Sequence, residues 1–252
     1  MNEIALSPPV IDPDAEFDRL SRRYRSAGGL GIQVLNLLGT QADGLLDRLP
    51  PQVRDQLNSV TQSALEQALI AASRSRAVVP DQAEWLNRAV SSAMGAAGGM
   101  GGLPTALAEL PVTTTLLLRL IEGVAVEHGF DPQTESVRFD CVQVFASAGP
   151  LEHDDGADIA FLSARMALSG VAVQTMISRV APRLAVVLGQ KLAAQTVPVL
   201  GAVAGAATNY AYTSYYTDMA HVHFGLRRLA VAADIPHEEA VDRLRAEVLR
   251  LK

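Results

Sequence analysis

The sequence predicts an all-α protein: a single domain of about eight to ten helices around a central helix that is rich in glycine and alanine. Apolar residues recur at three- and four-residue steps in most segments, and no window alternates polar and β-branched residues as a strand does. Hydrophobic residues make up 49% of the chain but aromatic residues only 5%. The core must therefore be built largely from Ala, Leu and Val, which suits closely packed helices.

Prolines, glycines and the apolar period place the individual helices. Residues 1–13 contain three prolines and are expected to form a flexible leader to a helical domain at 14–252. Pro111 is expected to kink or break the fifth helix near Leu110, because the residue before a proline disfavours the α conformation. Helices are expected at 14–26, 42–49, 51–73, 81–94, 105–127, 132–148, 155–178, 180–197, 198–233 and 238–251.

The charge and the cysteine content limit the kinds of partner that the protein can attract and the compartment that suits it. The net charge is −6 and the isoelectric point about 5.4, so the chain has no general attraction to nucleic acid. Cys141 is the single cysteine, which excludes an intrachain disulfide and is expected to be a packing residue. The N-terminus lacks the basic and then apolar pattern of a secretory signal. We therefore expect a cytoplasmic protein without a bound cofactor.

The uncharged run from Leu192 to Thr217 is long enough to cross a bilayer. It also holds several amides, hydroxyls and tyrosines, and each buried polar group costs free energy in hydrocarbon unless it is paired. Gly201, Gly205 and Asn209 share one helical face, where the missing Cβ lets another backbone approach closely. The run is interpreted as a buried, tightly packed helix, with a membrane-inserting segment as the alternative.

A second glycine cluster extends from Gly95 to Gly102. A phosphate-binding P-loop requires Lys and Ser or Thr after its last glycine, whereas Leu103 and Pro104 follow here. A dinucleotide fingerprint requires a preceding strand, and the pattern before Gly95 is helical. The cluster is therefore expected to be a hinge or a close contact between helices.

Few charged residues lie within apolar helices, and these are the candidates for chemistry. Arg119 and Glu122 are surrounded by leucines and are expected to form an ion pair with each other or with Asp218. Asp218 and His221 are three apart and share a face, whereas His221 and His223, two apart, cannot share a site. No partner motif completes a metal site, and no serine-hydrolase or zinc-protease motif occurs.

Two stretches resemble the EcsC protein family, which is named for a bacterial protein encoded beside an ABC transporter. The first reads ELPVTTTLLLR at 109–119, with RFDCVQVF following at 138–145. The second begins at Lys191 and reads QTVPVLGAVAGAATN at 195–209, DMAHVHF at 218–224 and RRL at 227–229. The likeness covers roughly residues 50–245 and departs at Ala204, where the family has a glycine-rich step.

The resemblance implies a helical, cytoplasmic bacterial protein, peripheral to the membrane and associated with export; it implies no reaction, cofactor or catalytic set. The leading hypothesis is therefore a membrane-peripheral accessory to transport or secretion, with the membrane surface or a membrane protein as partner. The alternative is an enzyme or small-ligand-binding protein with a polar site between the two motif helices. Its candidate residues are Arg119, Glu122, Asp218 and His221 for catalysis and Thr114 and Asn209 for ligand binding. The oligomeric state is left open.

Overall fold

The computed structural model describes residues 12–27, 51–76, 78–100, 102–146, 175, 177–178, 181 and 198–250. These residues form seven α-helices and no strand, which confirms the all-α class with slightly fewer helices than expected. The helices are α1 (Pro13–Ser26), α3 (Pro51–Arg76), α4 (Glu84–Met100), α5 (Gly102–Glu127), α6 (Glu135–Ala146), α8 (Pro198–Ala232) and α9 (His237–Arg250). Residues 1–11 of the leader expected at 1–13 and the helices expected at 42–49, 155–178 and 180–197 lie wholly or largely outside the described residues, whereas Asp12 caps α1 and Pro13 begins it.

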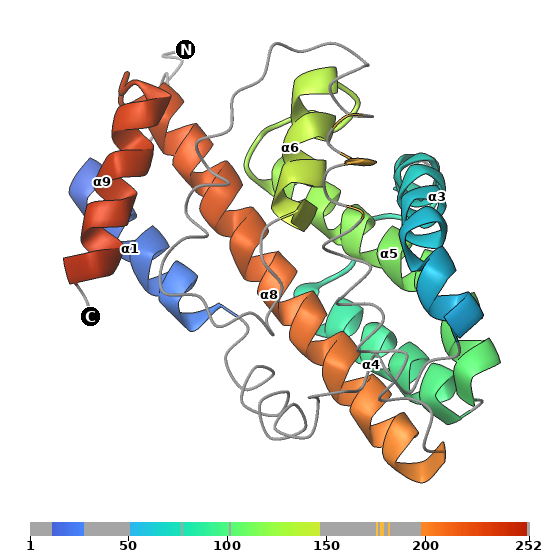
Figure 1. Ribbon diagram of the computed structural model, residues 1–252. Coiled ribbons are helices and arrows are strands. Elements are labelled where there is room, and N and C mark those ends of the chain that lie inside the picture. The colour runs from blue at the N-terminus through green and yellow to red at the C-terminus, as the bar shows by residue number, and fades with distance from the viewer. Residues whose placement is uncertain are drawn as a thin grey trace, which may run out of the picture.

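Helix α8 crosses the molecule as its central element (Figure 1). Helix α4 packs along its N-terminal half, α1 and α9 pack along its C-terminal half, and α5 and α6 contact its remaining faces. Its face from Ala211 to Thr217 is buried on nearly all sides. The uncharged run is thus a buried core helix over this C-terminal part, as the sequence predicted, whereas Val203 and Tyr210 nearer its start are 64% and 38% exposed. Among the described residues, no helix is both long and apolar enough to span a membrane.

The contact between α4 and α8 explains both glycine clusters. A Cβ at Gly95 would lie 2.2 Å from the carbonyl oxygen of Gly205, and one at Gly99 would lie 2.0 Å from that of Gly201. The two antiparallel helices therefore touch through their backbones. Beside the glycines, the Asn209 amide donates to the Ser91 carbonyl at 2.9 Å. Of the two sequence interpretations, the close helix contact is the one that the structure adopts.

Two apolar cores flank α8. The larger is formed by α3, α5, α6 and the middle of α8, and it contains stacked rings of Phe145 and Tyr216 at 5.0 Å. The smaller joins α1 and α9 to the C-terminal part of α8 through Phe17, Leu226 and Leu244. The N-terminal and C-terminal helices are thus held by α8 rather than by the larger core.

One predicted helix end is wrong, and of the kink or break expected near Leu110 the break does not occur. Helix α4 does not end before the glycines but continues to Met100, because burial against α8 compensates the poor helix propensity of glycine. Helix α5 does not break at Pro111. It is packed against α3, α4 and α8, and this tertiary support outweighs the loss of one backbone hydrogen bond.

Candidate functional site

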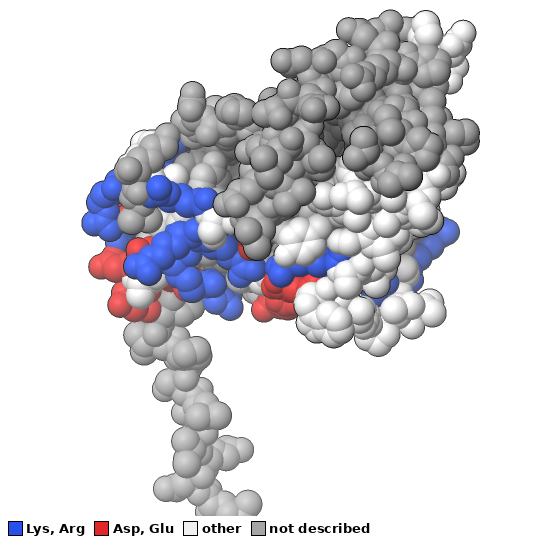
Figure 2. Space-filling view, turned by 90° about the horizontal axis from the view of Figure 1, so that it is seen from below, with Lys and Arg blue, Asp and Glu red and all other residues white. Residues whose placement is uncertain are grey.

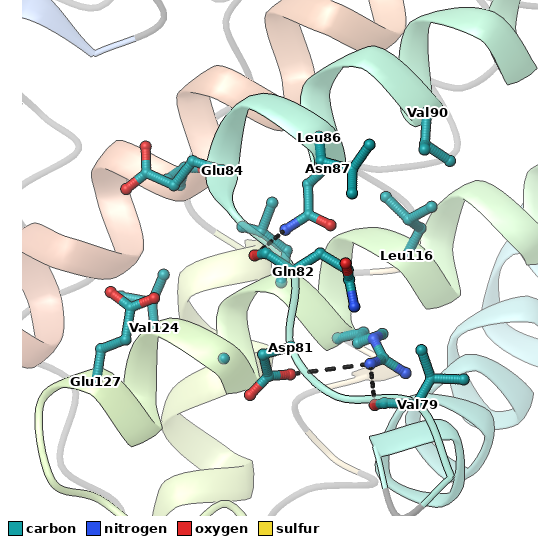
Figure 3. A pocket seen from close by; sticks show the side chains of 14 residues that line it. Val79, Asp81, Gln82, Glu84, Leu86, Asn87, Val90, Leu116, Val124 and Glu127 are labelled. Atoms are coloured by element: carbon teal, nitrogen blue, oxygen red, sulfur yellow. Dashed lines mark hydrogen bonds and ion pairs between the residues drawn. The ribbon is translucent and has the colours of Figure 1, made fainter.

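A pocket of about 290 Å³ lies between α4, α5 and the connection that precedes α4 (Figure 3). The connection contributes its rim, the first two turns of α4 form one wall, and the C-terminal half of α5 forms the other. The buried Thr217 of α8 also reaches it. The lining residues are Val79, Asp81, Gln82, Glu84, Leu86, Asn87, Val90, Leu116, Arg119, Leu120, Gly123, Val124, Glu127 and Thr217.

Of the site residues proposed from the sequence, Arg119 lines this pocket. It holds the connection that precedes α4 against α5. Its guanidinium donates to the Ser75 hydroxyl at 2.8 Å, to the Val79 carbonyl, and to the Pro80 carbonyl at 3.0 Å. The Asp81 carboxylate lies 3.9 Å away. The predicted ion pair of Arg119 with Glu122 or Asp218 is therefore wrong: its charge is balanced by carbonyl dipoles and a neighbouring aspartate.

Glu122 lies in the contact between α5 and α3 and does not line the pocket. The side chain is 1% exposed, and it accepts a hydrogen bond from the Ser73 hydroxyl at 2.9 Å. Burial raises the pKa of this carboxyl, against the lowering effect of the Ser73 hydrogen bond and of Arg76 and Arg138. The residue is a buried structural acid, and it does not reach the pocket wall.

Asp218 and His221 belong to an ionic cluster centred on Glu84 at the start of α4. The Asp218 carboxylate accepts from Arg23 of α1 at 3.0 Å, and the same guanidinium lies 3.5 Å from Glu84. Arg88 donates to the other oxygen of Glu84 at 2.7 Å. We call Arg23, Glu84, Arg88, His128, Asp218 and His221 the Glu84 cluster. It joins α1, α4, α5 and α8 beside the pocket.

The histidines of the cluster form a chain that ends on the Glu84 carboxylate. Nε2 of His221 lies 3.1 Å from Glu84 Oε1, and Nδ1 of His221 lies 3.0 Å from Nε2 of His128. The Glu127 carboxylate approaches the same His221 Nε2 at 3.8 Å. Glu84 and Glu127, which both line the pocket, are thus brought close together around one imidazole nitrogen.

The charge states of this chain follow from its contacts. The hydrogen bond from His221, aided by the charges of His221, Arg23 and Arg88, lowers the pKa of Glu84 to about 2 despite its partial burial. Burial, together with the charges of His221, Arg228 and Arg19, lowers the pKa of His128 to about 4. At neutral pH Glu84 is ionised and His128 is neutral. A carboxyl that is ionised at all physiological pH values is a hydrogen-bond acceptor and a poor general acid or base.

Asn209 and Thr114 do not reach the pocket. Asn209 is 1% exposed, and its amide donates to Glu109 at 2.7 Å within the contact of α4, α5 and α8. Thr114 is also buried. His223 lies 3.6 Å from Asp140 on α6, on another side of α8 from His221, as the spacing of the two histidines predicted. The proposed set of site residues thus separates into one pocket residue, two cluster residues and three buried residues elsewhere.

Three functional side chains were missed by reasoning from the sequence. Glu84, Glu127 and His128 lie at helix ends. Charged residues are common there, so their positions did not single them out as candidates. A signal was present for Glu84, since it stands four residues before Arg88 on a helix with no other charges. The approach of His128 to His221, which is 93 positions away, had no sequence signal.

The comparison with known protein families bears on this same region. A model described as the EcsC protein family matches residues 55–229, which is more than half of the chain. The chain belongs to the EcsC protein family. No curated protein and no solved structure matches it. The EcsC region contains α4, α5, nearly all of α8 and every residue that lines the pocket, whereas Arg23 of the Glu84 cluster lies on α1, outside that region.

Proposed function

We propose that this EcsC protein acts at a membrane surface, as a peripheral accessory to transport or secretion. The observation that supports the proposal is an outward-facing apolar stripe along α4. Its members follow one another at three- and four-residue steps, and all are exposed: Trp85, Ala89, Ala93, Ala97 and Met100. The outer face of a helix in a monomeric protein is normally polar, so such a stripe is typical of a docking surface.

Among the described residues, few charges surround the stripe from Ala89 onward, whereas Glu84 and Arg88 flank Trp85 on α4. Between Ala89 and Leu118 the sole ionisable side chain is Glu109, which is 8% exposed. The neighbouring part of α8, from Pro198 to Thr217, carries no charge at all. In Figure 2 a broad white area lies beside the region where charged side chains gather. We call the stripe, together with the exposed Val112 and Val203, the apolar face.

Lipid is the occupant that this chemistry fits best. Trp85 is 69% exposed and Met100 66% exposed, at opposite ends of α4. Tryptophan prefers the boundary between lipid head groups and hydrocarbon, and exposed apolar side chains gain free energy by entering it. Because the apolar face lacks basic residues, docking relies on apolar burial rather than on attraction to anionic lipid.

Vesicle binding tests this proposal directly, because Trp85 is the single tryptophan of the chain and reports on its own environment. We expect the full chain to float with neutral phosphatidylcholine vesicles and with vesicles containing phosphatidylglycerol, with a blue shift of Trp85 fluorescence in both. The double variant Met100→Ser and Val203→Ser should weaken vesicle binding by at least about tenfold, since two apolar side chains no longer enter the lipid.

Val231→Ser is the matched control, because Val231 is equally apolar and exposed but lies at the other end of α8. It should bind vesicles as the wild type does. A chain that stays in the soluble fraction with both vesicle types would refute docking on lipid. Flotation with native membrane vesicles but not with protein-free vesicles would instead assign the apolar face to a membrane-protein partner.

The pocket favours a second candidate function, the binding of a small ligand. It lies between α4 and α5 and is reached by the single α8 residue Thr217, whereas the sequence suggested a polar site between the motif helices α5 and α8. Since Glu84 is ionised and its hydrogen bonds are already made within the protein, the geometry favours binding over acid–base catalysis.

A further inference from the structure

We propose that the pocket between α4 and α5 binds a small amphipathic cation, a ligand with an ammonium group and a short alkyl chain. This inference rests on the second candidate function, ligand binding in the pocket, and is independent of membrane docking. It follows from three properties of the lining: where its hydrogen-bond donors point, where its acceptors remain, and where its apolar side chains lie.

The polar donors of the lining each make at least one hydrogen bond within the protein. Arg119 donates to Ser75 and to two backbone carbonyls. The amide groups do the same, since Asn87 donates to the Gln82 carbonyl at 3.2 Å and Gln82 to the Pro80 carbonyl at 2.9 Å. Thr217 donates its hydroxyl hydrogen to the Thr213 carbonyl at 2.6 Å. A ligand that needs donors, such as a carboxylate or a phosphate, therefore meets few that are available.

One carboxylate, that of Glu127, remains available as an acceptor at one end of the pocket. Glu127 is 59% exposed at its side chain, and it lies near Glu84 because both carboxylates approach Nε2 of His221. Figure 3 shows Glu84 and Glu127 on the same side of the pocket, away from Val90 and Leu116. An ammonium group, with three donors, matches this set of oxygens.

The remaining wall provides the apolar half of the site. Leu86 and Val90 of α4 face Leu116 and Leu120 of α5 across the pocket, and Val124 continues this wall toward Glu127. The volume of about 290 Å³ lies at the lower end of the range for ligand pockets. The ligand is therefore small: an ammonium head on the Glu127 carboxylate beside the ionised Glu84, with a short alkyl chain along the leucines.

Calorimetric titration of the full chain with three probes of equal length, hexylamine, hexanoate and hexanol, tests the inference. We expect binding of hexylamine, weaker binding of hexanol and none of hexanoate. Glu127→Gln should reduce hexylamine affinity at least about tenfold, because a charge-assisted hydrogen bond becomes a neutral one. Glu135→Gln, the same change at an exposed position on α6, should leave the affinity unchanged.

Each other outcome overturns the inference. Equal affinity for the three probes would mean that the pocket selects only for the alkyl chain. Preference for hexanoate would make Arg119 the anchor of the head group. Absence of hexylamine binding, or an unchanged affinity in Glu127→Gln, would remove the ammonium site. No vesicle is present in this titration, so its failure leaves the flotation result intact, and failed flotation leaves the titration intact.

Discussion

Gly99→Ala will destabilise the protein strongly, although the same change in an ordinary helix stabilises. The new Cβ would lie 2.0 Å from the Gly201 carbonyl oxygen and 2.3 Å from its carbon, and both atoms belong to backbone that cannot rotate away. Helices α4 and α8 must separate, which removes contacts along the whole pair. We expect a loss of at least about 1–3 kcal/mol in the free energy of unfolding, as for overpacked cores, measured by denaturant titration.

Gly123→Ala is the control for this prediction. Gly123 also lies within a helix, but a Cβ there would be 3.6 Å from its nearest neighbour, Asp81, which is an ordinary contact. The substitution should stabilise α5 by about 0.5–1 kcal/mol, because alanine loses less backbone entropy than glycine. If Gly99→Ala stabilised the protein to the same degree as Gly123→Ala, the direct backbone contact of α4 with α8 would be disproved.

Acidification should destabilise the protein in two steps, and His128 accounts for the first. The pKa of His128 is about 4 in the folded protein, against an ordinary value of 6.5. Between these values the unfolded chain binds the proton and the folded protein does not, so the free energy of unfolding falls as the pH falls from 6.5 to 4. The full effect is on the order of 3 kcal/mol.

Glu84 acts with the same sign at lower pH. Its pKa is about 2 in the folded protein, against an ordinary 4.5, so its contribution is complete above pH 4.5 and is lost as the pH falls toward 2. Glu122 acts in the opposite direction, because burial raises its pKa and protonation then favours the folded state. Because the folded pKa of Glu122 lies above 4.5, its effect falls within the pH range of the His128 step and offsets part of it, whereas the second step reflects Glu84 and other carboxyls with lowered pKa values.

Denaturant titrations at pH 7, 6, 5 and 4 on the wild type and on His128→Gln isolate the first step. Glutamine can still donate to His221 but does not titrate, so the variant should lose much of the pH dependence between 6.5 and 4. His237→Gln, at the start of α9 and outside the Glu84 cluster, should keep it. An identical pH dependence in His128→Gln and the wild type would show that His128 is not the titrating group.

The fold was predictable from the sequence because its signals are local. Pro51 starts α3, and the apolar spacing of its residues continues to its end. The uncharged segment of α8 was recognisable as a buried helix from its mixture of glycine, hydroxyl and amide groups. The wrong helix end at Gly95 and the break that does not occur at Pro111 are found where packing between distant helices outweighs the local preference of a residue.

The candidate site was predictable only in part. The rule that led to Arg119 and Glu122, that buried charges pair with each other, is sound but does not identify the partner. Arg119 is satisfied by backbone carbonyls of a connecting segment, and Glu122 by a serine hydroxyl of α3. Backbone carbonyls are identical in every residue, so a sequence contains no trace of which of them a side chain will contact.

By itself, the sequence determined that this chain is helical and that it resembles the EcsC proteins, because these properties depend on the order of neighbouring residues, and it limited its glycine-rich segments to a few interpretations. Only the tertiary structure decided that Glu84, Glu127 and His221 converge from three helices beside a pocket. Whether these three side chains meet depends on the length of each helix and on its rotation relative to the neighbouring helix. The packing of side chains throughout the molecule sets both quantities together.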